Sequence, residues 1–195
     1  DRLFRSDDGG EAWEERVTPK RPLHASSLRV DPLNSNSLYF FDAAEGFRSA
    51  DGGQSWVAFT LPAITRDLLI PAQSPQHIYA ATFSGVMVSS NGGQNWASAG
   101  ILTAASSLTA DPTNPNVLYA GVYMTGLWRT TNQGGLWKNV HGDARSGDVE
   151  AIAVNPTSPN TILIGGNEGL VRSTTAGTSW ASANTGIQAM RVEKF

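Results

Sequence analysis

The sequence contains no cysteine, few charged residues and no long apolar run. The absence of cysteine excludes disulfide bonds and cysteine-ligated metal sites. Charged residues make up 16% of the 195 residues and the net charge is −3, so no basic field is present to attract a nucleic acid. No apolar stretch approaches the roughly 18 residues that a membrane-spanning helix needs. Apolar residues also show no convincing period of 3.6, which argues against a helical repeat protein.

What the sequence has instead is a repeated octapeptide that ends in tryptophan. Its clearest copy is Ser49-Ala50-Asp51-Gly52-Gly53-Gln54-Ser55-Trp56, and further copies lie at residues 6–13, 89–96, 130–137 and 173–180. The five closing tryptophans are separated by 43, 40, 41 and 43 residues. They are Trp13, Trp56, Trp96, Trp137 and Trp180. A regular period in this range predicts repeated supersecondary units.

The octapeptide has the composition of a hairpin turn between two short strands. Its first residue is Ser or Thr and its third is usually Asp or Asn, side chains that accept backbone N–H groups within a turn. Asp8, Asp51, Asn91 and Asn132 hold the third position. The glycine at the fifth position suits a positive φ. The closing tryptophan offers a large apolar face and an N–H group, so we expect it to wedge between neighbouring sheets.

This octapeptide resembles the Asp-box, or BNR, repeat. Asp51-Gly52-Gly53-Gln54-Ser55-Trp56 matches the family consensus fully, whereas Thr175 departs from it in the last copy, where we expect a weaker turn. The family includes sialidases, xyloglucan-cleaving glycosidases, the sortilin ectodomain and photosystem assembly factors, which are β-propellers. The resemblance covers essentially the whole chain and implies that fold, together with an extracytoplasmic (secreted or periplasmic) location. It does not imply one function, because a fold hosts many.

Each repeat contains four short strand-like segments. First strands are expected at 27–30, 67–70, 107–110 and 151–154, second strands at 38–41, 78–81, 117–120 and 162–164, and the third and fourth flank the octapeptide. Turns rich in Pro and Asn separate the first two, since proline cannot donate within a ladder. We predict an all-β propeller of four-stranded antiparallel blades, with about five blades, or an arc of a larger propeller.

The predicted strands do not close a complete ring. Residues 1–195 form a single domain of four complete repeats with partial repeats at both ends, and the segment Met190 to Phe195 supplies only a first strand. The total is one strand short of five full blades. The unpaired edge predicts self-association, or closure by a missing chain segment.

Function is expected on the face opposite the octapeptide turns, where the inter-blade loops and the loops between second and third strands gather. Loops held by a rigid scaffold commonly carry binding residues. The candidates for this face are Glu45, Arg66, Asp67, Tyr123, His141, Asp143, Arg145, Asp148, Glu150 and Glu168. Carboxylate pairs such as Asp148 and Glu150 could act as acid and base in glycoside cleavage. The default interpretation is that they are the solvated charges that any exposed loop carries.

No catalytic, metal or cofactor constellation follows from the sequence. A sialidase would need an arginine cluster with a tyrosine nucleophile, and Arg66, Arg145, Arg191 and Tyr123 share no local motif. Calcium-loop ligand spacing is missing, and the three histidines lie in different repeats. We therefore predict a non-enzymatic binding or assembly module that recognises a protein or a polysaccharide. The alternative is a fragment or relative of an extracellular glycoside hydrolase; the xyloglucanase type resembles two facing propellers, of which this chain could supply one.

Overall fold

The computed structural model describes residues 2–18, 27–42, 45–72, 77–142, 148–167 and 169–187. These residues form 18 strands and no helix. The described part of the chain accordingly holds no helix that could cross a membrane.

The strands form one two-stranded sheet and four four-stranded sheets, in which sequence neighbours pair antiparallel. Blade 1 contains β1 (Leu3–Arg5) and β2 (Glu14–Arg16). Blade 2 contains β3 (Ser27–Asp31), β4 (Asn34–Asp42), β5 (Glu45–Ser49) and β6 (Val57–Thr60). Blade 3 contains β7 (Thr65–Leu69), β8 (Ile78–Thr82), β9 (Gly85–Ser89) and β10 (Ala97–Ser98). Blade 4 contains β11 (Ala105–Ala110), β12 (Leu118–Val122), β13 (Gly126–Thr130) and β14 (Trp137–His141). Blade 5 contains β15 (Val149–Val154), β16 (Ile162–Gly166), β17 (Gly169–Ser173) and β18 (Ala181–Ser182).

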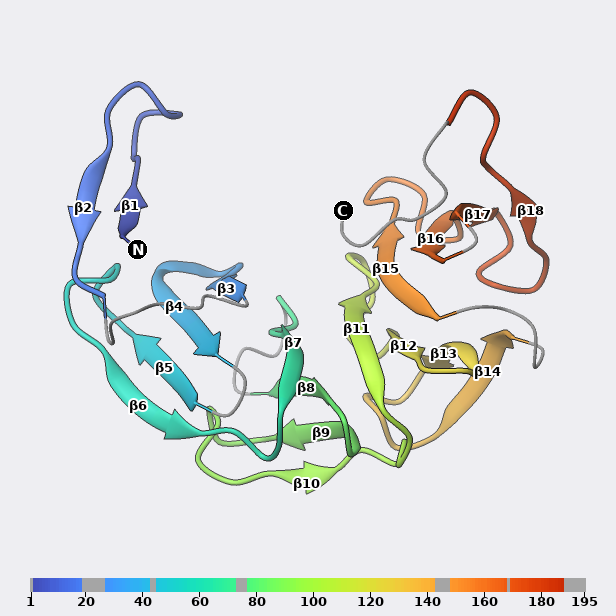
Figure 1. The fold of residues 1–195 in the computed structure, drawn as a ribbon, viewed down its shortest axis with the longest axis horizontal. Coiled ribbons are helices and arrows are strands. Elements are labelled where there is room, and N and C mark those ends of the chain that lie inside the picture. Colours follow the sequence, from blue (N-terminus) through green and yellow to red (C-terminus); the bar gives the residue numbers. More distant parts are fainter. Residues whose placement is uncertain are drawn as a thin grey trace.

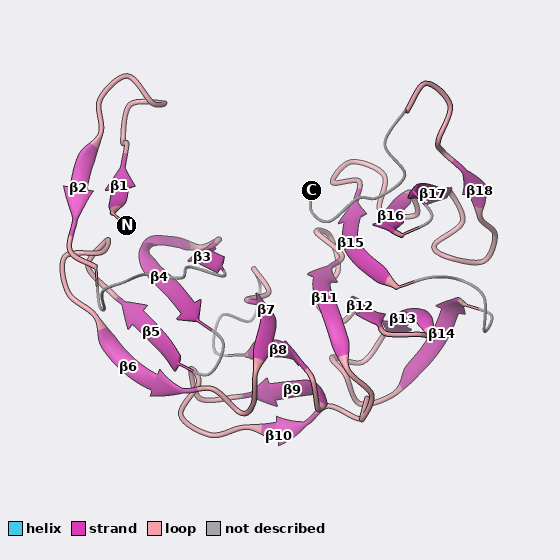
Figure 2. Ribbon diagram, viewed as in Figure 1, coloured by secondary structure: helices cyan, strands magenta, loops and turns pink. Residues whose placement is uncertain are grey.

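The blades follow one another around an arc (Figure 1). The first strand of each complete blade lies on the inner side and the fourth on the outer side, and Figure 2 shows that strands and turns make up the whole arc. The propeller architecture predicted from the repeat is confirmed. The expected strand from Met190 to Phe195 lies outside the described residues.

One predicted turn is shorter than expected. The segment between the strands expected at 27–30 and 38–41 was predicted to be a turn, but β4 already begins at Asn34, which pairs with Asp31. The reason is the residue at position 35. Serine stands there, where Pro75, Pro115 and Pro159 stand in the other repeats, and serine keeps the N–H group that a strand can use.

The five octapeptide turns share one hydrogen-bond pattern, as the sequence predicts. The first side chain accepts the N–H of the fifth residue, and the third accepts the N–H of the seventh. In the second copy these bonds are Gly53 N to Ser49 Oγ, 2.8 Å, and Ser55 N to Asp51 Oδ1, 2.9 Å. The fifth glycine has a positive φ in every copy, between 89° and 99°. The side chains at the first and third positions therefore fix the backbone conformation of the turn by accepting these hydrogen bonds.

The last copy of the turn keeps this bonding, although Thr175 stands where the other copies have Asp or Asn. That its turn is weaker stays a prediction. The Thr175 hydroxyl accepts the Ser179 N–H at 2.9 Å, the same length as the bond in the second copy. A single hydroxyl oxygen can accept this bond, whereas in the second copy both oxygens of Asp51 accept bonds.

Each tryptophan after the first joins its blade to the preceding one. The indole N–H donates to a backbone carbonyl at the end of the preceding outer strand: Trp56 to Val17 (2.7 Å), Trp96 to Thr60 (2.9 Å), Trp137 to Ala99 (2.6 Å) and Trp180 to Val140 (2.9 Å). Trp13 donates instead to Gly10 of its own turn and is 62% exposed. The expected wedge between sheets is therefore present at four blade junctions.

The hydrophobic core lies between neighbouring blades. One cluster of buried residues joins blades 2 and 3 around Tyr39 and Leu68, a second joins blades 3 and 4 around Tyr79 and Leu108, and a third joins blades 4 and 5 around Tyr119 and Ile162. Each cluster combines second-strand side chains of one blade with strands of the next, so a blade is stabilised by its neighbours.

Turns and loops are sorted to opposite sides of the arc. The octapeptide turns bond to the turns between first and second strands, as Gln133 N does to Asn116 O at 3.0 Å. On the other side, Phe83 N donates to Ile64 O and Tyr123 N to Ala104 O, which joins the second-to-third-strand loops to the inter-blade loops. We call this second side the loop face.

Candidate functional site

Polar contacts tie the inner strands of three successive blades together. The Asp67 carboxylate, on β7, pairs with the Arg29 guanidinium on β3 and accepts the Leu108 N–H of β11 at 2.9 Å. Arg29 also donates to the Leu68 carbonyl at 2.9 Å. Burial raises the pKa of the Asp67 carboxyl above its usual range, and Arg29 opposes that rise. Both carboxylate oxygens of Asp67 are therefore engaged in holding the blades in place.

Next to Asp67 in sequence, Arg66 lies between two aromatic rings. Its guanidinium carbon is 4.7 Å from the centre of the Phe83 ring and 4.8 Å from the centre of the Tyr123 ring. Phe83 comes from the β8–β9 loop and Tyr123 from the β12–β13 loop, so the stack spans blades 3 and 4. Arg66 is exposed and has no ion pair with another described residue. A guanidinium between two rings is attracted to both faces.

Exposed aliphatic side chains continue this stack along the loop face. Ile64 adjoins Phe83 through the backbone bond named above, Leu102 lies against the Gly85 backbone, and Met124 follows Tyr123. Leu102 and Met124 are 78% and 81% exposed. We call this set the loop strip; it consists of Ile64, Arg66, Phe83, Leu102, Tyr123 and Met124. Single exposed apolar residues are ordinary, but several on neighbouring loops of one face are typical of an interaction surface.

The end of the loop strip is held by an acidic residue of blade 5. The Met124 N–H donates to Asp148 Oδ1 at 3.1 Å, and Met124 adopts a left-handed backbone with φ of 59°. A positive φ at a residue with a side chain is strained. The bond to Asp148 helps hold this conformation, which presents the Met124 side chain to solvent.

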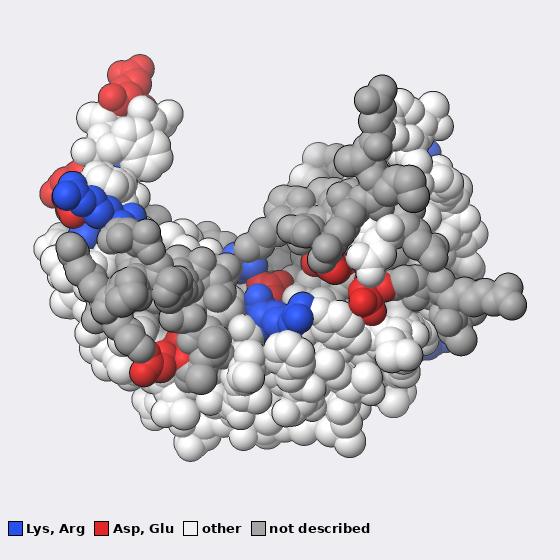
Figure 3. All heavy atoms as spheres, viewed as in Figure 1, with Lys and Arg blue, Asp and Glu red and all other residues white. Residues whose placement is uncertain are grey.

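Charged side chains of both signs gather on the inner side of the arc, over β7, β11 and β15 (Figure 3). The described charged residues on or next to these strands include Arg66, Asp67, Asp148 and Glu150, and Arg29 of β3 reaches the region through its ion pair with Asp67. Opposite charges side by side cancel much of each other's field at a distance. The loop face accordingly combines local polar contacts with apolar surface.

The structure brings some of the predicted site residues together and separates others. Arg66 and Tyr123 meet, and Asp148 lies at the end of the same strip. Asp67 is buried in the inner-strand contacts, Glu45 begins β5 in blade 2, and Glu150 lies in β15. The His141 ring packs edge-on against Trp180, with ring centres 4.8 Å apart. Asp143, Arg145 and Glu168 lie outside the described residues.

Phe83, Leu102, Ile64 and Met124 were not among the predicted site residues. The sequence predicts that the loops carrying them lie on the ligand-binding face, but the candidates on that face were polar side chains. The signal that could have found them is an apolar residue next to the turn of a short loop, where a core position is not expected.

The groups exposed on the loop face are of the kinds that bind a ligand by non-covalent contacts. It offers a cation, two aromatic rings, exposed aliphatic groups and the backbone of short loops. The carboxylates of Asp67 and Asp148 accept backbone N–H groups. Among the residues that the structure describes, no group of three or more His, Asp or Glu side chains could hold a metal ion.

No protein-family model and no curated protein matches the chain, but solved structures match its fold. An ancestral GH74 enzyme has a TM-score of 0.73 and 20% identity, covering 83% of this chain and 24% of that chain. The GH74 xyloglucanase from Xanthomonas campestris has a TM-score of 0.54 and 16% identity, covering 80% and 38%. YCF48 bound to D1 peptide has a TM-score of 0.63 and 19% identity, covering 92% and 59%.

At these identities the similarity concerns the fold, which is that of a propeller module. The chain spans 24% of the length of the ancestral GH74 enzyme and 38% of the xyloglucanase. What those proteins cleave or bind is a property of their own sites, because one fold carries many functions.

Proposed function

We propose that this chain is a binding module that recognises an extended segment of a protein through the loop strip. The observation that carries the proposal is the stack of Phe83, Arg66 and Tyr123, built from two blades and open to solvent. Stacking restrains the Arg66 guanidinium while its N–H groups point to no carboxylate among the described residues. A restrained, exposed cation can bind a ligand with little further loss of side-chain entropy.

The aliphatic part of the strip supports a protein ligand over a carbohydrate. Leu102 and Met124 offer apolar surface for leucine-like or aromatic side chains, and methionine adapts to several shapes. Sugars stack best on an open aromatic face, whereas Phe83 and Tyr123 each turn one face to Arg66. YCF48, whose fold is similar, has been solved with a D1 peptide. An extracytoplasmic location, implied by the repeat family, belongs to the same proposal.

Selection from a random-peptide display library with the purified chain tests the proposal. We expect selected peptides to bind with an affinity that Arg66→Ala and Tyr123→Ala each lower by roughly tenfold, the loss of one good contact. Val57→Ala is the matched control, because Val57 is exposed on β6, away from the loop face. If selected peptides bind both variants as tightly as the parent chain, the loop strip is not the binding surface.

A second candidate function rests on the similarity to the GH74 enzymes. If the chain is part of a glycoside hydrolase, it should bind xyloglucan oligosaccharides on the same face, and calorimetric titration measures this directly. Binding of the oligosaccharide that Arg66→Ala abolishes, with no peptide selected, would favour this candidate over a protein ligand.

A further inference from the structure

The first strands of blades 3, 4 and 5 carry the same irregularity. In each of them the antiparallel pairing with the second strand skips one residue close to the start of the strand. The skipped residues are Arg66 in β7, Ser106 in β11 and Glu150 in β15. A bulge of this kind changes the direction of one side chain and is common beside functional sites.

The bulges of blades 3 and 4 use their side chains differently. The Ser106 hydroxyl donates to the Val149 carbonyl, which belongs to the first strand of blade 5. The Arg66 side chain contacts the two rings of the stack and donates no hydrogen bond to a residue that the structure describes. The bulge of blade 4 therefore joins two blades, whereas that of blade 3 presents a cation on the loop face.

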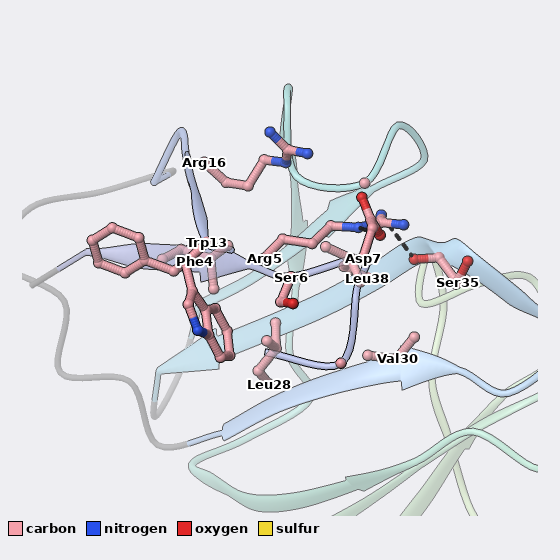
Figure 4. Close-up of a pocket in the computed structure, with 13 residues that line it drawn as sticks. Phe4, Arg5, Ser6, Asp7, Trp13, Arg16, Leu28, Val30, Ser35 and Leu38 are labelled. Carbon is pink, nitrogen blue, oxygen red and sulfur yellow. Dashed lines mark hydrogen bonds and ion pairs between the residues drawn. The ribbon is translucent and has the colours of Figure 1, made fainter. Parts of the chain in front are cut away.

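Other arginines of the chain have polar partners for their N–H groups. Arg5, which lines a cavity of about 500 Å³ between blades 1 and 2, donates to Asp7 Oδ1 at 2.8 Å and to the Ser35 carbonyl at 3.5 Å (Figure 4). Arg29 is paired through its inner-strand contacts. A guanidinium stacks on aromatic rings with its flat faces. Within the described part of the chain, the N–H groups along the edge of the Arg66 guanidinium are therefore left for a ligand.

Apolar groups lie around this cation at the middle of the arc. The stack is at the junction of blades 3 and 4, which both have four strands and a further blade on their other side (Figure 1). The exposed side chains of Ile64, Leu102 and Met124 belong to the same loop strip. A segment that crosses this junction meets one cation with aliphatic surface beside it.

The charges near Arg66 favour a carboxylate ligand over a phosphate. The Asp67 carboxylate is paired with Arg29, and Asp148 and Glu150 add two more negative charges to this side of the arc. A phosphate group with a charge of about −2 near pH 7 is repelled by these carboxylates more strongly than a singly charged group is. A carboxylate also matches the planar guanidinium with two parallel hydrogen bonds.

We propose that the protein segment bound by the loop strip carries one carboxylate that accepts two hydrogen bonds from the Arg66 guanidinium, with aliphatic side chains beside it. This inference rests on the proposed function, because it names the chemistry of the ligand at the same site. The carboxylate belongs to an Asp or Glu side chain or to the C-terminus of the segment, since the two groups present the same pair of oxygens.

Two synthetic pools of random, N-terminally acetylated hexapeptides test the inference. The peptides of one pool have an amidated C-terminus and those of the other a free one. Peptides that co-elute with the purified chain in size-exclusion chromatography are sequenced by mass spectrometry. We expect Asp or Glu at a constant place beside Leu, Ile, Met or Phe in the amidated pool. Peptides selected only from the free pool would assign the carboxylate to the chain terminus.

An amide twin of the tightest peptide isolates the contribution of the carboxylate. It has Gln in place of Glu, Asn in place of Asp, or an amidated C-terminus, and calorimetric titration should show at least roughly tenfold weaker binding to the parent chain. Arg66→Lys keeps the charge without the planar fork. This variant should bind the carboxylate peptide roughly tenfold more weakly and the amide twin within about twofold of the parent chain.

Arg48→Lys is the matched control variant. Arg48 is also exposed and stacked, 5.7 Å from the centre of the Tyr39 ring, but it lies next to an octapeptide turn, on the side opposite the loop face. Both affinities should stay unchanged in this variant. Circular dichroism and thermal unfolding check that each variant is folded.

The outcomes separate this inference from the proposed function. Peptides that need Arg66 but bind equally well as carboxylate and amide forms overturn the inference and leave the proposed function standing. Full binding of the carboxylate peptide by Arg66→Lys also overturns it, as does tighter binding of a phosphoserine form of the peptide. Selection of no peptide from either pool overturns both.

Discussion

At the scale of single residues, the third position of the octapeptide decides how the turn responds to pH. Hydrogen bonds from the Ser55 hydroxyl, the Ser55 N–H and the Ser49 hydroxyl hold the pKa of the Asp51 carboxyl well below its usual range. Asn91 makes the equivalent bond to the Asn95 N–H at 2.9 Å with an amide that does not titrate. Two copies of one turn thus differ in charge and not in geometry.

Asp51→Asn should change how stability depends on pH. Because the folded-state pKa of Asp51 lies below the unfolded one, its stabilisation is complete above the unfolded pKa of about 3.9 and is lost as the pH falls toward the folded pKa. The melting temperature of the parent chain should therefore exceed that of the variant near neutral pH, and the difference should shrink below about pH 4. Asn91→Asp is the mirror variant and should gain this dependence. Parallel curves of melting temperature against pH for parent and variant would contradict the assignment.

The tryptophans should differ in their contribution to stability according to the blade that precedes them. Trp137 is buried and bonded to Ala99, whereas Trp13 is mostly exposed. Trp137→Ala should lower the free energy of unfolding by about 3–5 kcal/mol, as truncation of a core aromatic does. Trp13→Ala should lower it by less than about 1 kcal/mol, the effect of a surface change. Urea denaturation measures both, and equal losses would mean that the junction bond is unimportant.

At the scale of elements, the start of the third strand is a point of close contact. Gly126 and Gly85 both have positive φ, and a side-chain carbon at either would strike a backbone carbonyl at the end of the fourth strand or shortly after it: His141, the last residue of β14, for Gly126, and Ile101, beyond β10, for Gly85. The third strand can begin there only because glycine leaves this space empty.

Gly126→Ala should destabilise the chain by more than about 1 kcal/mol, because the strained φ and the contact with His141 act together. Gly9→Ala is the control, since Gly9 has a positive φ of 78° but no neighbour within 4 Å. Thermal unfolding of the two variants separates the steric contact from the backbone strain. Equal melting temperatures for the two would show that the contact relaxes at no cost.

The strands were predictable from the sequence because they are local. Apolar runs, the Pro and Asn turns and the octapeptide place each strand within a few residues, and Ser35 in place of proline explains the one longer strand. The Phe83–Arg66–Tyr123 stack was not predictable as a unit. It depends on how far blade 4 is rotated against blade 3, which the packing of Tyr79 and Leu108 determines. Arg66 and Tyr123 were candidates separately, and only their loops indicated a common face.

At the scale of the whole molecule, the protection of backbone amides from hydrogen exchange should differ between the blades of the arc. Every residue of β8 and β12 is buried, and the inter-blade clusters meet there, whereas blade 1 belongs to none of the three. In repeat structures the terminal units open first because they have one neighbour. Amide hydrogen exchange should be slowest in β8 and β12 and fastest in β1 and β2. Uniform exchange along the chain would mean that the arc unfolds as one cooperative unit.

The hydrogen bonds from the tryptophan indoles all run in the same direction, from one blade to the blade before it. In blades 2 to 5 the tryptophan of each blade donates its indole N–H to a backbone carbonyl of the blade before it. Blades 2 to 4 therefore carry both the donor and the acceptor of this contact. Copying one of these repeats in place would reproduce both the donor and the acceptor and leave the other contacts unchanged. The number of blades is accordingly free to vary by duplication or loss of single repeats, without any new interface having to arise.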